Sequence, residues 1–257
     1  MALLHVNIFS RVLGMATQMD VILPVTEECD PYPTLYLLHG MSDDHTIWQR
    51  MTSIERYAGE YKLAVVMPTT HLGWYTDMRH GLRYFTFLTE ELPKICRNLF
   101  PRMSAVREEN FVAGLSMGGY GAFKLCLGRP DIFGAAASLS GALDIRYLNT
   151  WLDTQNDDNS LWLNIFGDLD KIKGNENDLF YLAEKVKDSV KLPPKLYIWC
   201  GTEDFLYEGN VNMKNHLTEI GYDYTYEESE GDHQWKYWDE KIKTVLQWLP
   251  LKKQNEI

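Results

Sequence analysis

The sequence predicts an α/β protein with a mostly parallel central sheet and helices on both faces. Short apolar runs at 34–40 (TLYLLHG), 63–68 (LAVVMP) and 195–201 (KLYIWCG) have the length and composition of strands that are buried on both faces. They alternate with longer segments whose apolar residues recur at helical spacing, which is the order expected of βαβ units. The 257 residues show no internal repeat and no linker, so we expect a single domain over residues 1–257.

The first expected elements in chain order are an antiparallel strand pair and a buried strand. Residues 5–10 and 17–24 flank a turn at Gly14 and are typical of two antiparallel strands. The run at 34–40 follows and ends at a glycine, as expected of a buried parallel strand. A helix is then expected over 46–62. Four apolar residues of this stretch share one helical face: Ile47, Met51, Ile54 and Ala58.

Strands and helices continue to alternate to the end of the chain. Further strands are expected over 63–68, 110–114, 134–141, 195–201 and 222–228, and further helices over 87–100, 118–130, 210–221 and 235–251. Residues 142–192 interrupt this rhythm, because they exceed a simple crossover between strands. We expect an inserted segment there, which is either a lid over one end of the sheet or surface decoration.

Charge and composition exclude several classes of function. The hydrophobic share of 45% and the charged share of 24% are ordinary for a globular protein. A net charge of −11 disfavours nucleic acid and anionic membranes as partners. The amino terminus lacks the features of a signal peptide, and no run approaches the roughly 20 apolar residues of a membrane helix. We therefore expect a cytoplasmic protein that acts on a small molecule, with association into a homo-oligomer left open.

Neither the cysteines nor the histidines are spaced like metal ligands. The cysteines are scattered, and we expect reduced, mostly buried thiols: Cys29, Cys96, Cys126 and Cys200. A metal site could be imagined from loop residues, but they have no ordered ligand pattern: Asp43, Asp44, His45, His71, Asp77 and His80. The sequence thus predicts chemistry without a metal or a cofactor.

Ser116 is the candidate nucleophile. It lies in NFVAGLSMGGYGAF, residues 110–123, with Gly114 and Gly118 two positions away on either side. The residues before it are typical of a buried strand and those after it of a helix, so the serine falls at a sharp strand-to-helix turn. At the start of a helix, the dipole favours developing negative charge. The alternative is a turn serine that only caps the helix.

A serine nucleophile needs a general base and a carboxylate that orients this base. His233 is the candidate base, because it lies in a polar loop between the last β-like segment and the final helix. Asp204 is the candidate acid, because it comes just after the strand over 195–201 and completes the chain order serine, aspartate, histidine. The weaker candidates for the acid are Glu203, Asp168, Asp170 and Asp232. Among other histidines, His39 is expected to orient a loop, whereas His71 and His80 could line a site.

The oxyanion of an acyl-transfer intermediate needs backbone donors. One is expected to be the N–H of Met117, directly after the nucleophile. The other is expected from the loop after an early strand, where Gly40 permits a tight bend and the N–H of Met41 follows.

Five stretches together resemble the tributyrin-esterase type of carboxylesterase, which is similar to the esterase D and S-formylglutathione hydrolase proteins. They are LYLLHGMSDDHTIW, LAVVMP, GLSMGGYGA, CGTEDFLY and GDHQWKYWD, and the resemblance spans nearly the whole chain. It implies an α/β-hydrolase fold and hydrolysis of short-chain acyl esters by Ser116, His233 and Asp204. It also implies oxyanion donors at Met41 and Met117. One departure is the Asp43–Asp44 pair, which places negative charge near the site and puts anionic substrates in doubt.

Several functions remain open on this scaffold. An acyltransferase would use the same chemistry with another acceptor, and a cinnamoyl (feruloyl) esterase would bind an aromatic acid. A non-catalytic binding protein would have lost a member of the catalytic triad, and all three are present. Trp151 and Trp162 are candidate substrate-binding residues, since the inserted segment could close a compact pocket over Ser116. Trp74 and Tyr75 could also face an aromatic acid.

Overall fold

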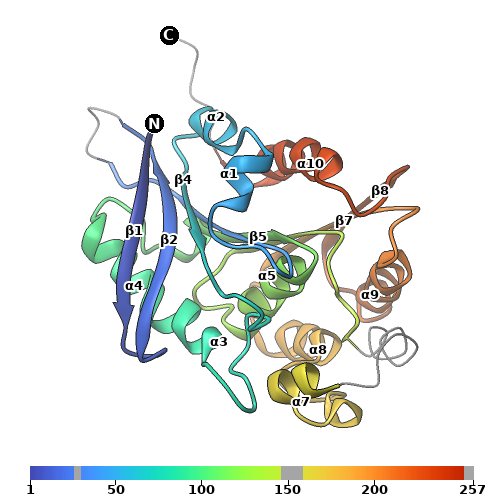
Figure 1. The fold of residues 1–257 in the computed structure, drawn as a ribbon. Helices are drawn as coiled ribbons and strands as arrows, with labels where there is room; N and C mark the ends of the chain where they lie inside the picture. The colour runs from blue at the N-terminus through green and yellow to red at the C-terminus, as the bar shows by residue number, and fades with distance from the viewer. Residues whose placement is uncertain (26–29, 146–158, 252–257) are drawn as a thin grey trace.

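The centre of the molecule is a sheet of eight strands, which alternate with helices along the chain. The structure is a computed structural model that describes residues 1–25, 30–145 and 159–251 (Figure 1). The strands are β1 (Ala2–Ser10), β2 (Met15–Leu23), β3 (Thr34–Leu38), β4 (Ala64–Pro68), β5 (Asn110–Leu115), β6 (Ala135–Leu139), β7 (Lys195–Gly201) and β8 (Tyr224–Ser229). Their order in the sheet is β1-β2-β4-β3-β5-β6-β7-β8. β2 pairs antiparallel with β1 and β4, and every other pair is parallel. The antiparallel opening pair and the mostly parallel sheet are as predicted, whereas the pairing of β2 with β4 was not predicted.

Helices cover both faces of this sheet (Figure 1). One core lies under α1 (Ile47–Met51), α2 (Ile54–Gly59) and α10 (Trp235–Trp248). The other core lies under the remaining helices: α3 (Tyr84–Thr86), the π-helical turn η1 (Phe87–Glu91), α4 (Leu92–Leu99), α5 (Met117–Gly128), α7 (Ser160–Phe166), α8 (Leu179–Ser189) and α9 (Tyr207–Glu219). The short turns η2 (Arg107–Glu109) and η3 (Leu169–Lys171) connect other elements.

The order of the strands places two loops side by side at one edge of the sheet. After β3 the chain moves to β4 on one side, and it then returns to β5 on the other side. The ends of β3 and β5 are in register, with Leu38 opposite Gly114. Ligands of open α/β sheets bind at such a switch in strand order, beyond the carboxyl ends of the strands. The loop after β3 therefore meets the turn that carries Ser116.

The prediction of a single helix over 46–62 is wrong, because the segment forms two short helices, α1 and α2. Thr52 is extended, and both its N–H and its hydroxyl donate to the carbonyl of Trp48, which ends α1. Ser53 then donates its N–H to Asp239 on α10 (3.2 Å). Met51 is exposed as a result and does not share the buried face of Ile54 and Ala58. A bond to another helix thus outweighs the local helical periodicity.

The thiols that the structure describes are buried and unpaired, as expected for Cys96, Cys126 and Cys200; Cys29 lies outside the described residues. In the described part of the chain, we find no helix with the length and apolar character needed to cross a bilayer.

Buried Lys124 ties the inserted segment to the helix that follows Ser116. Its ammonium group donates to the carbonyl of Glu176 (2.7 Å) and to Oδ1 of Asn177 (2.7 Å). The hydroxyl of Tyr120, one turn earlier on α5, donates to the carbonyl of Asn177 (3.0 Å). Burial lowers the pKa of Lys124 to about 7, with partial compensation from Glu176 and Asp77.

We expect the contribution of Lys124 to stability to depend on pH. Unfolded lysine titrates near its ordinary pKa, so between about pH 7 and 10 the unfolded chain binds more protons than the folded one. The stability that Lys124 confers must therefore rise with pH over this range. Denaturant unfolding of the wild type and of Lys124→Met at pH 7, 8.5 and 10 measures it. The free energy of unfolding of the wild type minus that of Lys124→Met should rise from pH 7 to pH 10 by at least about 1.4 kcal/mol, the equivalent of one pKa unit. A gap independent of pH would contradict the assignment.

Candidate active site

Ser116 lies at a strained turn between β5 and α5. Its φ of 52° and ψ of −120° are rare for a residue with a side chain. A Cβ on Gly114 would lie 2.4 Å from the carbonyl oxygen of Gly118, and one on Gly118 would lie 2.5 Å from that of Leu38. Only glycine fits these positions, so the strand, the turn and the helix pack closely around the serine. The Ser116 side chain makes no capping hydrogen bond, which argues against a serine that only caps the helix.

The two serines on the neighbouring strand are less accessible. Ser138 and Ser140 are fully buried on and just after β6. The hydroxyl of Ser140 accepts a hydrogen bond from the indole of Trp238 (3.1 Å). Ser116, by contrast, lines a cavity.

His233 and Asp204 meet as the sequence predicts. Nδ1 of His233 lies 2.8 Å from Oδ2 of Asp204, whose side chain is fully buried. The other carboxylate oxygen accepts the N–H of Leu206 (2.9 Å), which fixes the acid at the end of β7. With the carboxylate facing Nδ1, that nitrogen carries the proton and Nε2 is left as the basic nitrogen. His233 lines the same cavity as Ser116.

The loop that carries His233 is fixed by Glu203. The backbone N–H of Glu203 donates to the carbonyl of Gly231 (3.0 Å), and its carboxylate accepts the N–H of Gly231 (2.5 Å). A Cβ on Gly201 would lie 2.1 Å from the same carbonyl oxygen, so the loop rests directly on the end of β7. Glu203 thus acts on the loop backbone and not on the imidazole.

The other candidate acids have different partners. The carboxylate of Asp232 accepts from the amide of Gln234 (2.5 Å). Asp168 pairs with Lys171 at the surface (2.9 Å) and accepts the N–H of Asp170. Of the candidate acids, all of which the structure describes, Asp204 is the one paired with His233.

The loop after β3 is oriented by His39, as expected. Its Nε2 accepts the N–H of Thr70 (3.0 Å), so its Nδ1 carries the proton and donates to the carbonyl of Gly40 (2.7 Å). Burial lowers the pKa of His39 to about 4, which keeps the ring neutral near neutral pH. The N–H of Met41 belongs to the same trans peptide unit as the Gly40 carbonyl and points the opposite way. Anchoring the carbonyl therefore fixes the direction of this candidate oxyanion donor.

Met117, the other candidate donor, is the first residue of α5. Backbone N–H groups in the first turn of a helix have no partner within it and favour negative charge. Both candidate donors thus lie on backbone beside Ser116: Met41 lines the cavity with it, and Met117 follows it in the chain.

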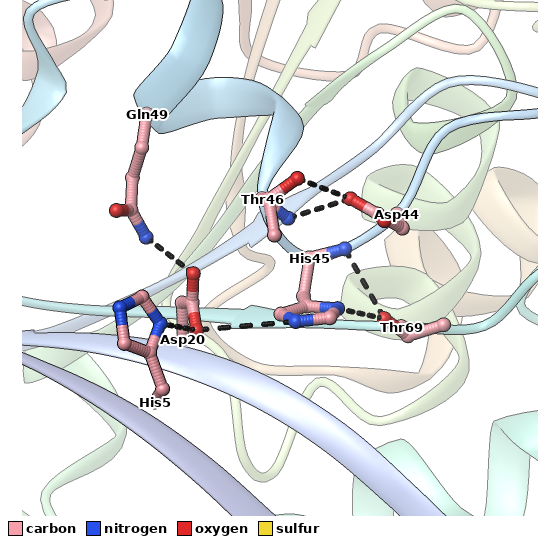
Figure 2. A network of polar contacts seen from close by, with 7 residues as sticks. All are labelled: His5, Asp20, Asp44, His45, Thr46, Gln49 and Thr69. Atoms are coloured by element: carbon pink, nitrogen blue, oxygen red, sulfur yellow. Dashed lines mark hydrogen bonds and ion pairs between the residues drawn. The ribbon is translucent and has the colours of Figure 1, made fainter.

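A second polar network fixes the rest of this loop (Figure 2). Buried Asp20 on β2 accepts from Nδ1 of His5 (2.7 Å) and from the amide of Gln49 on α1 (2.7 Å). His45 lies between Asp20 and Thr69, with 4.0 Å from Nε2 to Asp20 and 2.6 Å from Nδ1 to the Thr69 hydroxyl. The network joins β2, the end of β4 and the start of α1, so it holds the loop from both sides.

Ser116 and His233 open onto a cavity of about 520 Å³ with apolar walls. We call the buried side chains that line it the floor: Trp74, Leu115, Ala142, Trp162, Leu206 and Trp238. We call the more exposed side chains that line it the mouth: Met41, Asp43, Phe205 and Trp235. The expected substrate-binding residue Trp162 is therefore in the floor, where its ring packs against Trp74 (5.1 Å between centroids). Trp151 lies outside the described residues.

Histidines that could have lined the site do not reach this cavity. His71 contacts the hydroxyl of Tyr84 (3.0 Å), and His80 lines a separate polar cavity with Arg79 and Lys171. Tyr75 is buried, with its hydroxyl on the carbonyl of His39 (2.7 Å). Residues 1–25, 30–145 and 159–251 contain no group of three histidine, cysteine or acidic side chains that could hold a metal ion.

Sequence reasoning missed the aromatic rings around His233. Phe205 and Trp238 lie 4.6 and 4.8 Å from the imidazole, measured between ring centroids, and Trp235 packs on Trp238 (5.3 Å). The available signal was the spacing in DHQWKYW, which places two tryptophans three residues apart on α10 directly after the histidine.

Comparison with known proteins gives full-length matches. The model of the Putative esterase family matches residues 10–249. An acetyl esterase from Caldicellulosiruptor saccharolyticus is 33% identical, over 97% of this chain and 98% of its own.

Two solved structures from Staphylococcus aureus share the fold. The fluorophosphonate-binding serine hydrolase FphF is 38% identical, with a TM-score of 0.88 over 96% of this chain and 98% of its own. The S-formylglutathione hydrolase FrmB is 39% identical, with a TM-score of 0.86 over the same shares. The family match and these relatives show that the chain belongs to the Putative esterase family and is an ester hydrolase with the α/β-hydrolase fold.

Proposed function

We propose that this protein is a serine carboxylesterase that hydrolyses short-chain acyl esters, with Ser116, His233 and Asp204 as its catalytic triad. The observation that carries the proposal is the 2.8 Å contact between His233 and buried Asp204 on the cavity that also holds strained Ser116. The acetyl esterase relative supports a short acyl group. In this proposal residues 1–257 form a single domain that acts in the cytoplasm. The proposed chemistry is the same whether or not the protein forms a homo-oligomer.

In the acylation step, Nε2 of His233 takes the proton of the Ser116 hydroxyl as its oxygen attacks the ester carbonyl. Asp204 stabilises the imidazolium that forms and remains ionised. The carbonyl oxygen becomes an oxyanion, which accepts hydrogen bonds from the N–H groups of Met41 and Met117. When the intermediate collapses, His233 returns the proton to the departing alcohol and the acyl group stays on Ser116.

In the deacylation step, water takes the place of the alcohol. His233 removes a proton from this water as it attacks the acyl carbonyl, and the same two N–H groups stabilise the second oxyanion. Collapse releases the carboxylic acid and returns the proton to Ser116. No step needs a metal ion or a redox cofactor.

The first prediction from this mechanism concerns the nucleophile. Ser116→Ala should fold and lose esterase activity by about 10³-fold or more, because attack through the serine oxygen is no longer available. A fluorophosphonate probe should label the wild type and not the variant, which mass spectrometry of the intact protein measures. Ser138→Ala is the matched control: its hydroxyl is buried without a partner, so this variant should keep activity and labelling. Labelling at Ser138 or Ser140 would move the nucleophile elsewhere.

The second prediction separates the candidate acids. Asp204→Asn should lower kcat by about 10³- to 10⁴-fold, because an amide at this position favours the wrong imidazole tautomer. Its carbonyl oxygen can still accept the N–H of Leu206, so the loop should persist. Asp232→Asn, which makes the same change beside His233, should retain most of the activity. Equal kcat values for Asp204→Asn and the wild type would exclude Asp204 as the acid of the triad.

The third prediction concerns acyl-chain length. Each methylene that fits the apolar floor adds about 0.8 kcal/mol of binding, and longer chains then meet the buried wall formed by Trp162 and Trp74. We expect kcat/KM for p-nitrophenyl esters to rise from acetyl to about butyryl and to fall by octanoyl. Trp162→Ala should move the optimum to a longer chain.

The control for chain length is Leu163→Ala, the next residue on α7, which is exposed and lines a different cavity. Its profile should match the wild type. Trp162→Phe serves if the alanine variant does not fold. A wild-type optimum at decanoyl or longer would refute the closed floor. If the preferred acyl-chain length is unchanged in the Trp162 variants, residues other than Trp162 restrict the chain length.

A further inference from the structure

The cavity beside Ser116 has an uneven distribution of charge. Of the described residues that line it, two are ionisable, Asp43 and His233, and none is a lysine or an arginine. The chain as a whole carries a net charge of −11. A cavity with apolar walls and charge of one sign concentrates its field on whatever enters it.

Asp43 is close to the reacting centre. A Cβ placed on Gly40 would lie 3.1 Å from Oδ2 of Asp43 and 3.8 Å from Cβ of Ser116. Both side chains are therefore close to the Gly40 backbone. Burial and, to a lesser extent, the neighbouring Asp44 raise the pKa of Asp43, whereas a hydrogen bond from the Gly40 backbone and the exposed Arg50 oppose this rise. The carboxylate has thus lost part of its hydration without gaining a cation inside the cavity. A positive group in the cavity would supply this missing interaction.

The surroundings of Asp43 at the mouth suit a particular kind of cation. The other more exposed side chains that line the cavity are Met41, Phe205 and Trp235, which offer a thioether and two aromatic rings. Aromatic faces attract cations, and quaternary ammonium groups above all, because such groups are weakly hydrated. The floor is buried and apolar, which fits the acyl chain. With the acyl chain in the floor, the alcohol portion of the ester is left to the mouth.

From this juxtaposition of a carboxylate, two aromatic rings and an uncharged floor, we propose that the mouth selects esters whose alcohol portion is cationic, with Asp43 as the specificity-determining residue. The preferred substrate class is the short-chain acyl ester of an amino alcohol or a quaternary ammonium alcohol. Esters with an anionic alcohol portion are disfavoured by the same carboxylate. This inference rests on the proposed esterase function.

The test uses three butyryl esters that differ in the charge of the alcohol. They are butyrylcholine, its uncharged isostere 3,3-dimethylbutyl butyrate, and the anionic butyryl ester of 3-hydroxypropanoate. Release of butyric acid is followed by pH-stat at pH 8, with p-nitrophenyl butyrate as the reference for intact chemistry. The variants are Asp43→Asn, Asp43→Glu and Glu230→Gln. The last is the matched control, because exposed Glu230 lies on the loop before His233 and does not line the cavity.

The wild type should favour butyrylcholine over the neutral isostere by about tenfold in kcat/KM, and the neutral over the anionic ester by a similar factor. Asp43→Asn should reduce both ratios to about threefold or less, and because each ratio compares two esters within one variant, a general loss of activity does not affect it. Asp43→Glu should keep part of the preference for the cationic ester, and Glu230→Gln should keep all of it. Added salt should weaken this preference in the wild type.

Two results would overturn the inference and leave the esterase function in place. One is a wild type that hydrolyses p-nitrophenyl butyrate without distinguishing the three esters. The other is a cationic preference that persists unchanged in Asp43→Asn. A protein that hydrolyses none of the four esters would instead refute the proposed esterase function and, with it, this inference.

Discussion

The close packing of Gly118 against the carbonyl of Leu38 is the constraint on which the site depends. It brings the start of α5 against the end of β3, with no room for a side chain between them. The Ser116 backbone takes a strained conformation at this contact. The same contact places the loop of Gly40 and Met41 beside the serine. One backbone contact therefore positions the candidate nucleophile and both candidate oxyanion donors.

The acid and base follow the ends of β7 and β8, and they are positioned by separate contacts. Asp204 is fixed at the end of β7 by the N–H of Leu206, and the His233 loop is fixed by the paired bonds between Glu203 and Gly231. His39 and the network around Asp20 hold the loop after β3 in a comparable way. The proposed chemistry therefore uses few side chains, and many buried polar groups serve to position the backbone around them.

The sequence predicted the fold well because the parallel strands from β3 to β7 are mostly apolar runs with a glycine or proline near their ends. The more polar edge strand β8 is the exception. It also predicted that Ser116, Asp204 and His233 belong to one edge of the sheet, since each follows or approaches a strand end. It did not predict the break between α1 and α2, which depends on Asp239 almost two hundred residues away. The packing of Phe205 on His233 is a tertiary contact that no local pattern encodes. The spacing in DHQWKYW was a signal for Trp238, and the resemblance already placed the charge of Asp43 near the site.

The central claim is that an acyl group is carried on Ser116 during turnover. The most direct measurement is rapid acid quenching of the enzyme with p-nitrophenyl butyrate, followed by trypsin digestion and mass spectrometry. Residues 108–124 form one tryptic peptide in which Ser116 is the sole serine. The proposal predicts a butyryl adduct on this peptide that appears during turnover and disappears once the ester is consumed. An adduct confined to another peptide, or turnover in which this peptide stays unmodified, would contradict it.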